Sequence, residues 1–171
     1  MSNLLSILMI SLLAILTYQD FKSKQISWFL IPLLFIGFVT IALLRVQAAE
    51  LLTWFGVNLL IVLLNLVGVT IIISIKERKV TNIIDSYLGL GDVLFFVVLT
   101  VVFSPLNFMI FFLGSILITT LVYGGFILFN KNKRTLIPLA GTMSLLLVAA
   151  FFIEHFYPEF RFYHDIISIV E

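Results

Sequence analysis

Six apolar segments follow one another along the chain, and short polar stretches separate them. The pattern predicts helices at about residues 2–19, 26–44, 51–75, 83–104, 106–130 and 136–153. Apolar runs of roughly twenty residues are typical of transmembrane helices. The sequence therefore predicts an all-α, polytopic membrane protein with six transmembrane helices in a single domain, residues 1–171. Residues 154–171 form a short polar and aromatic tail to that domain.

The fourth segment is the shortest, because only about a dozen residues lie between Val93 and Pro105. Two interpretations stay open. The helix begins at Val93 and is buried among the others, or it begins near residues 83–85 and is interrupted at Gly89 and Gly91. Irregular backbone at membrane depth is tolerated only where protein or a water-filled cavity covers it. Both interpretations place residues 89–92 in a protected recess.

Composition excludes several classes of protein. Hydrophobic residues make up 62% of the 171 residues and charged residues 11%, too few for a water-exposed shell. The chain has no cysteine, which excludes disulfides, thiolate metal sites and cysteine nucleophiles. The basic residues are few and scattered, so nucleic-acid binding is not expected. No spacing of histidine or acidic residues supports a metal site, and we expect no cofactor.

The basic residues are distributed unevenly between alternate loops. Eight of the ten lie in the first, third and fifth loops: Lys22, Lys24, Lys76, Arg78, Lys79, Lys131, Lys133 and Arg134. Only Arg45 and Arg161 fall on the opposite side. Because cytoplasmic loops carry the excess of Lys and Arg, the pattern predicts a multi-pass protein of the cytoplasmic (inner) membrane with both termini outside. The lipid bilayer is one expected partner, and the sequence leaves the oligomeric state open.

Two aspartates lie at the cytoplasmic ends of predicted helices. Asp20 ends the first apolar run, and Asp92 opens the fourth, within Gly89-Leu90-Gly91-Asp92. An aspartate at mid-membrane costs roughly 2.5–3.5 kcal/mol, and less toward the interface, so such a residue is a functional candidate. A pair of carboxylates can hydrolyse a peptide bond without a metal. The ionised one takes a proton from water, and the protonated one donates to the carbonyl oxygen.

Helix polarity suggests a division of labour between the two carboxylates. Asp92 lies near a helix N-terminus, where the dipole favours negative charge, and Asp20 near a C-terminus, where the dipole opposes it. We therefore expect Asp92 to be the base and Asp20 the acid, although in a coupled pair the assignment is nominal. Gly89 and Gly91 are expected to let a substrate backbone approach Asp92 and to permit a turn before the helix.

Each of these features also has a purely structural interpretation. Asp92 alone fits a helix N-cap, and Asp20 alone fits a solvated residue beside Lys22 and Lys24. The two glycines fit close helix packing. Asp85 fits a loop or cap residue better than a catalyst. Two further pairs are expected to be structural or solvated, namely Asn58 with Asn65 in interhelical hydrogen bonds, and His155 with His164 on the outer side.

Three motifs together resemble the type IV prepilin peptidase family. Asp20-x-Lys22-x-x-x-Ile26 resembles its first motif, and Gly89-Leu90-Gly91-Asp92 resembles the second, Gly-x-Gly-Asp-x-Lys. Ile137-Pro138-Leu139-Ala140 resembles a stretch of its last core helix. The resemblance implies a membrane aspartic endopeptidase with Asp20 and Asp92 as the catalytic pair. It also implies supporting or substrate-binding roles for Gly89, Gly91, Lys22 and Pro138.

The family cleaves the basic leader from prepilins, pseudopilins and related precursors at the cytoplasmic membrane face, so the resemblance implies substrates of that kind. Many members also methylate the new N-terminus and carry a cysteine-bearing insertion, which this chain lacks. It resembles a compact form, and methylation stays open. Leu94 replaces the motif's Lys, and Ser27 and Trp28 replace its Pro-Asn.

These departures keep other functions under consideration. One is a catalytically inactive homologue that acts as a membrane scaffold or pilus-assembly subunit. Another is a small ion-coupled transporter, although two acids at one face with no midplane partner argue against it. The discriminating quantity is the distance between the two carboxyl groups. A separation within about 8 Å supports catalysis through a bridging water, and one above roughly 15 Å opposes it.

Overall fold

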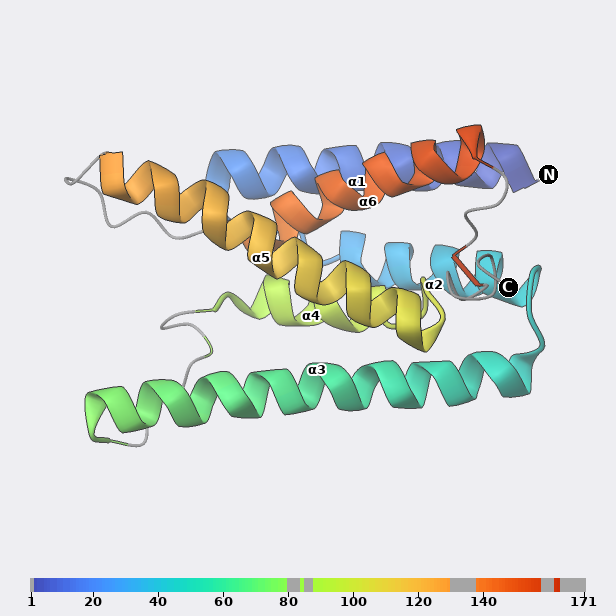
Figure 1. The fold of residues 1–171 in the computed structure, drawn as a ribbon. Coiled ribbons are helices and arrows are strands. Elements are labelled where there is room, and N and C mark those ends of the chain that lie inside the picture. The colour runs from blue at the N-terminus through green and yellow to red at the C-terminus, as the bar shows by residue number, and fades with distance from the viewer. Residues whose placement is uncertain (1, 80–83, 85–87, 130–137, 158–161, 164–171) are drawn as a thin grey trace.

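The computed structural model describes residues 2–79, 84, 88–129, 138–157 and 162–163. This part of the chain is all-helical, which confirms the predicted fold class (Figure 1). Its six helices are α1 (Ser2–Ser23), α2 (Leu30–Leu43), α3 (Ala48–Glu77), α4 (Leu90–Leu99), α5 (Pro105–Phe129) and α6 (Leu139–Phe156). Four of them, α1, α3, α5 and α6, are long and apolar enough to cross a membrane. Helices α2 and α4 are shorter apolar helices.

Helix α4 covers less of the chain than the predicted range of 83–104. It begins at Leu90, after Gly89 in an extended conformation, and ends at Leu99. Its end is set by a residue of another helix. The Asn58 side-chain amide, fully buried on α3, donates to the carbonyl oxygens of Thr100 (2.9 Å) and Phe103 (3.0 Å). These hydrogen bonds stabilise a turn where the apolar sequence alone would allow the helix to continue. Residue 83 and residues 85–87 lie outside the described part.

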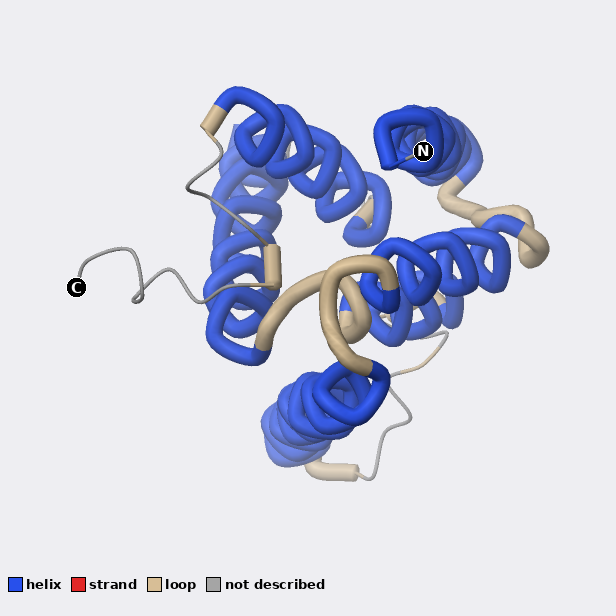
Figure 2. The backbone as a smooth tube through the Cα atoms, turned by 90° about the vertical axis from the view of Figure 1, so that its right-hand side faces the viewer, coloured by secondary structure: helices blue, strands red, loops and turns tan. Residues whose placement is uncertain are grey.

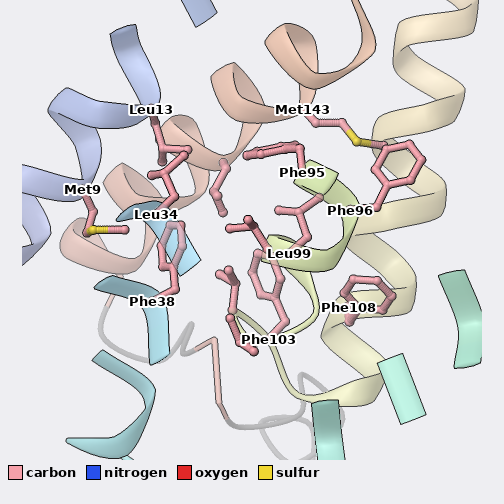
Figure 3. Close-up of a cluster of buried hydrophobic side chains, with 14 of the residues drawn as sticks. Met9, Leu13, Leu34, Phe38, Phe95, Phe96, Leu99, Phe103, Phe108 and Met143 are labelled. Carbon is pink, nitrogen blue, oxygen red and sulfur yellow. The ribbon is translucent and has the colours of Figure 1, made fainter. Parts of the chain in front are cut away.

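Helix α4 lies in the middle of the bundle, and its short length follows from that place. Phe95, Phe96 and Leu99 are buried and pack against side chains of the surrounding helices (Figure 3). Ten residues rise only about 15 Å, half the thickness of the hydrocarbon core. The helix therefore depends on its neighbours for cover. This agrees with the sequence expectation that the segment is buried among the others.

Helices α1 and α6 pack more extensively against each other than any other pair, and α2 and α5 flank them (Figures 1 and 2). Close approach within the bundle uses small residues. A Cβ atom on Gly37 of α2 would lie 2.3 Å from the Met9 sulfur of α1. The contact between α1 and α6 matters most for function, because it brings the end of α1 to the start of α6.

Helix α3 lies at the edge of the bundle (Figures 1 and 2). Its buried residues are Leu51, Asn58 and Val62, all in its first half. At the same end of the molecule, the Phe162 carbonyl accepts hydrogen bonds from the Ser104 N–H (3.0 Å) and the Asn107 side chain (3.2 Å). This part of the predicted tail is therefore packed onto the loop before α5, opposite the end that carries the aspartates.

Candidate active site

The two aspartates meet at the first turn of α6. Asp20 lies in the last turn of α1, and its Oδ2 accepts a hydrogen bond from the Gly141 N–H at 2.6 Å. Asp92 lies in the first turn of α4, and its Oδ1 accepts one from the Ala140 N–H at 2.7 Å. Only three backbone bonds join these two nitrogens, so they lie within about 4 Å of each other. The bonded carboxylate oxygens are consequently within roughly 10 Å of one another.

The first turn of α6 can hold two carboxylates because its N–H groups are otherwise unpaired. The first four N–H groups of an α-helix have no partner within the helix, and Ala140 and Gly141 are the second and third residues of α6. The positive end of the helix dipole also favours carboxylates there. Pro138 precedes the helix at the N-cap position and is buried. Its carbonyl oxygen accepts the Thr142 N–H at 3.1 Å, which closes the turn.

Asp92 is bonded through both of its carboxylate oxygens. Besides the contact with Ala140, its Oδ2 accepts the Gly89 N–H at 3.2 Å. Gly89 is the N-cap of α4 and Asp92 is its third residue, so this contact forms one half of a capping box. Helix capping therefore accounts for only one of the two oxygens of the Asp92 carboxylate. The bond from α6 to the other oxygen is additional to capping.

Asp20 is only 5% exposed. That burial does not fit the alternative in which it is a solvated residue beside two lysines. Burying a carboxyl group is unfavourable unless it is hydrogen-bonded, and a titratable group buried beside a second one is a functional-site candidate. Two carboxylates in this proximity also repel each other, so one of them is favoured in the protonated form.

Three glycines lie near the aspartates, and the lack of a Cβ atom on each allows a different close contact. A Cβ on Gly141 would lie 2.8 Å from Asp20 Oδ2 and 3.1 Å from Asp20 Cβ. A Cβ on Gly89 would lie 3.2 Å from Asp92 Oδ2, and one on Gly91 would lie 3.1 Å from Ile26 Cδ1. No described glycine has a positive φ. Close approach, rather than an unusual backbone angle, accounts for these positions.

Sequence reasoning missed Gly141 and the amide of Ala140. The available signal was the pair of small residues that follows Pro138 at the start of the last helix. Sequence alone did not show that this turn faces both aspartates.

Hydrogen bonds between hydroxyl groups join the first turns of α6 to α1 and α5. Thr17 of α1 and Ser144 of α6 are 2.6 Å apart through their hydroxyl oxygens. Thr119 of α5 and Thr142 of α6 are 2.8 Å apart in the same way. The first pair lies about one helical turn from the contact of Asp20 with Gly141. The register between α1 and α6 is thus fixed by two adjacent polar contacts.

The lysines near Asp20 have different surroundings. The Lys22 ammonium donates to the Tyr18 hydroxyl at 3.0 Å and lies 5.2 Å from the Tyr18 ring centroid. Lys24 interacts electrostatically with the Asp20 carboxyl group. Its φ is 54°, and its N–H donates to the Asp20 carbonyl oxygen at 3.0 Å, so α1 ends immediately after the aspartate turn. Leu94 is 42% exposed, on the outer side of α4.

No group of three histidine, cysteine or acidic side chains is arranged to hold a metal ion among the residues that the structure describes. His155 is exposed near the end of α6, away from the aspartates. Asp85 and His164 lie outside the described residues. At the first turn of α6, the described hydrogen bonds bring together two carboxyl groups and backbone N–H groups.

A family model described as the type IV leader peptidase family matches residues 7–124. The matched range contains both aspartates and ends before α6. No curated protein and no solved structure matches the chain.

Proposed function

The chain belongs to the type IV leader peptidase family, as its motifs predicted, and from that premise we propose that it is an aspartic endopeptidase with Asp20 and Asp92 as its catalytic pair. The family is one of proteases. One observation carries the proposal. Two carboxyl groups 72 residues apart in the sequence are hydrogen-bonded to consecutive amides of α6. A purely structural role for one aspartate would not require the other aspartate to be hydrogen-bonded to the neighbouring amide of α6.

The surroundings of the two carboxyl groups support a division of labour. Asp92 accepts two N–H groups and lies in the first turn of α4, and both features stabilise negative charge. Asp20 accepts one N–H group, is buried, and lies in the last turn of α1, where the dipole opposes negative charge. We assign Asp92 as the base and Asp20 as the acid.

The reaction then follows from these protonation states. Asp92 takes a proton from a water molecule, and the hydroxide adds to the carbonyl carbon of the peptide. Asp20 gives its proton to the carbonyl oxygen, and a gem-diol forms. The proton on Asp92 passes to the amide nitrogen as the C–N bond breaks, and Asp20 regains a proton from the gem-diol. Neither step needs a cofactor, and both groups return to their starting states.

The proposed substrates are prepilin-like or pseudopilin precursors, each with a basic leader joined to an apolar helix. Four long apolar helices support a multi-pass membrane protein. The aspartates lie at the ends of α1 and α4, on the side that the basic loops assign to the cytoplasm. In the proposed complex the leader stays in the cytoplasm and the apolar helix stays in the bilayer. Only a locally extended segment between them reaches the carboxyl groups.

The test is cleavage of a co-expressed precursor that has a basic leader and an apolar N-terminal helix. Asp20→Asn and Asp92→Asn each keep the size of the side chain and remove an ionisable group. We expect each to lower the cleavage rate by about 10²–10⁴-fold, the typical contribution of a catalytic acid or base. Glu50→Gln is the matched control, because Glu50 is exposed in the first turn of α3.

Undiminished cleavage by either variant would contradict the assignment of the pair. Restoration of pilus assembly by the double Asn variant, in a strain that lacks the protein, would instead favour the scaffold function. Leu94, at the position of the motif's Lys, is the residue that motivates this second measurement.

A further inference from the structure

Helix α5 brings a tyrosine to the level of the two aspartates. Helices α5 and α6 run antiparallel (Figure 1), and the contact between Thr119 and Thr142 fixes their register. Residues four apart on a helix share a face, so Tyr123 lies one turn beyond Thr119 on the face toward α6. In the antiparallel register it is opposite Pro138, at the start of α6.

The usual direction of an aromatic side chain on a helix would bring the hydroxyl group closer still. Aromatic side chains in helices lean toward the N-terminus of their own helix. On α5 that direction leads from the level of Pro138 toward Ala140 and Gly141, the residues that hold the carboxyl groups. An electrostatic interaction between Tyr123 and the Asp20 carboxyl group accompanies this placement. The side chain is half-buried, so part of it is accessible from outside the bundle.

The proposed reaction places one donor, the Asp20 acid, on the carbonyl oxygen, and a second hydrogen-bond donor to that oxygen would lower the barrier further. Negative charge develops on the carbonyl oxygen as the hydroxide adds, and enzymes stabilise such an oxygen with positioned donors. The amides of Ala140 and Gly141 are already bonded to the carboxyl groups. By the register of α5 on α6, the Tyr123 side chain lies at the level where Asp20 delivers its proton to that same oxygen.

We propose that Tyr123 is a further catalytic residue, whose hydroxyl group donates a hydrogen bond to the carbonyl oxygen of the peptide bond being cleaved. The tyrosine keeps its proton throughout the reaction, so the proton transfers between water, Asp92, Asp20 and the peptide are unchanged. This inference rests on the proposed function, because it concerns the same peptide bond and the same acid.

The first experiment compares Tyr123→Phe with the wild type, as the full chain in detergent, on the same precursor. The variant removes one oxygen and keeps the ring. We expect kcat to fall by about 10²-fold, the typical effect of losing one oxyanion donor, while KM stays within about threefold. Tyr157→Phe is the control, because Tyr157 is exposed at the opposite end of α6 and should keep full activity.

A second measurement separates catalysis from packing. A peptide whose scissile bond is replaced by a hydroxyethylene group imitates the tetrahedral intermediate. Its affinity for the Tyr123→Phe variant should fall by the same factor as kcat/KM, whereas the affinity for an uncleavable peptide with a planar amide should not change. Unchanged kcat, or equal losses for both ligands, would overturn the inference. Undiminished cleavage by Asp20→Asn would refute the proposed function itself, so the two failures are distinguishable.

Discussion

Gly141 lies where the main chain of α6 comes closest to the carboxyl group of Asp20. Its N–H bonds Asp20 at 2.6 Å, and a Cβ at this position would lie 2.8 Å from the bonded oxygen. The neighbouring Ala140 performs the same task for Asp92 with a methyl group present. The requirement for glycine therefore applies to the residue that holds Asp20 and not to the residue that holds Asp92.

We expect Gly141→Ala to lower kcat by about 10²-fold, because a misplacement near 1 Å has an effect of that size on a positioned group. Gly114→Ala is the matched control, since Gly114 is also helical and nothing lies within 4 Å of an added Cβ. The control should keep full activity and be equally or more stable, by up to about 1 kcal/mol. Equal kcat values for the two variants would show that Asp20 does not need this close approach.

At the scale of the element, α1 and α6 are joined by two polar contacts one turn apart. Thr17 bonds Ser144 and Asp20 bonds Gly141. Each hydroxyl group is also within reach of a carbonyl oxygen of its own helix, that of Leu13 for Thr17 and that of Gly141 for Ser144. Because a hydroxyl group has one proton, one of the two donates to the other hydroxyl while its partner donates to its own carbonyl oxygen. Removing one hydroxyl therefore leaves its partner with a second bond, and the main effect of the change falls on helix register rather than on burial of an unpaired group.

We expect Thr17→Val and Ser144→Ala each to lower the free energy of unfolding by about 1 kcal/mol and kcat by about tenfold. The double variant should lose little more than either single variant, because both remove the same contact. Thr53→Val controls for a threonine bonded only within its own helix. Additive losses in kcat would mean that the two hydroxyl groups act separately and that their contact does not position the aspartate.

The fourth helix shows how far sequence could predict an element. Its apolar run and the two glycines predicted a helix beginning near Asp92. Its end could not be predicted, because Asn58, 42 residues earlier, bonds the Thr100 carbonyl oxygen. The aspartate pair was predictable because charge placed both helix ends on one side. The amides that hold the pair were not, since they depend on how α6 packs.

At the scale of the whole molecule, the distribution of the basic residues predicts which loops face the cytoplasm, without any knowledge of contacts. Eight of ten lie in alternate loops, and the ends of α1 and α4 that carry the aspartates are on that side. Proteolysis of a leader in the cytoplasm requires this orientation, because a pair on the opposite face would never meet a leader that stays inside. The proposed topology and the proposed activity therefore depend on each other.

We expect single cysteines to report this orientation clearly, because the chain has none of its own. Ser23→Cys, after the aspartate turn of α1, and Gln47→Cys, between α2 and α3, are both at exposed positions. A membrane-impermeant maleimide added to intact cells should label Gln47→Cys and leave Ser23→Cys unlabelled until the membrane is opened. Both variants should keep cleaving the precursor, which shows that the labelled protein is folded. The reverse labelling pattern would place the aspartates outside and remove the cytoplasmic leader as their substrate.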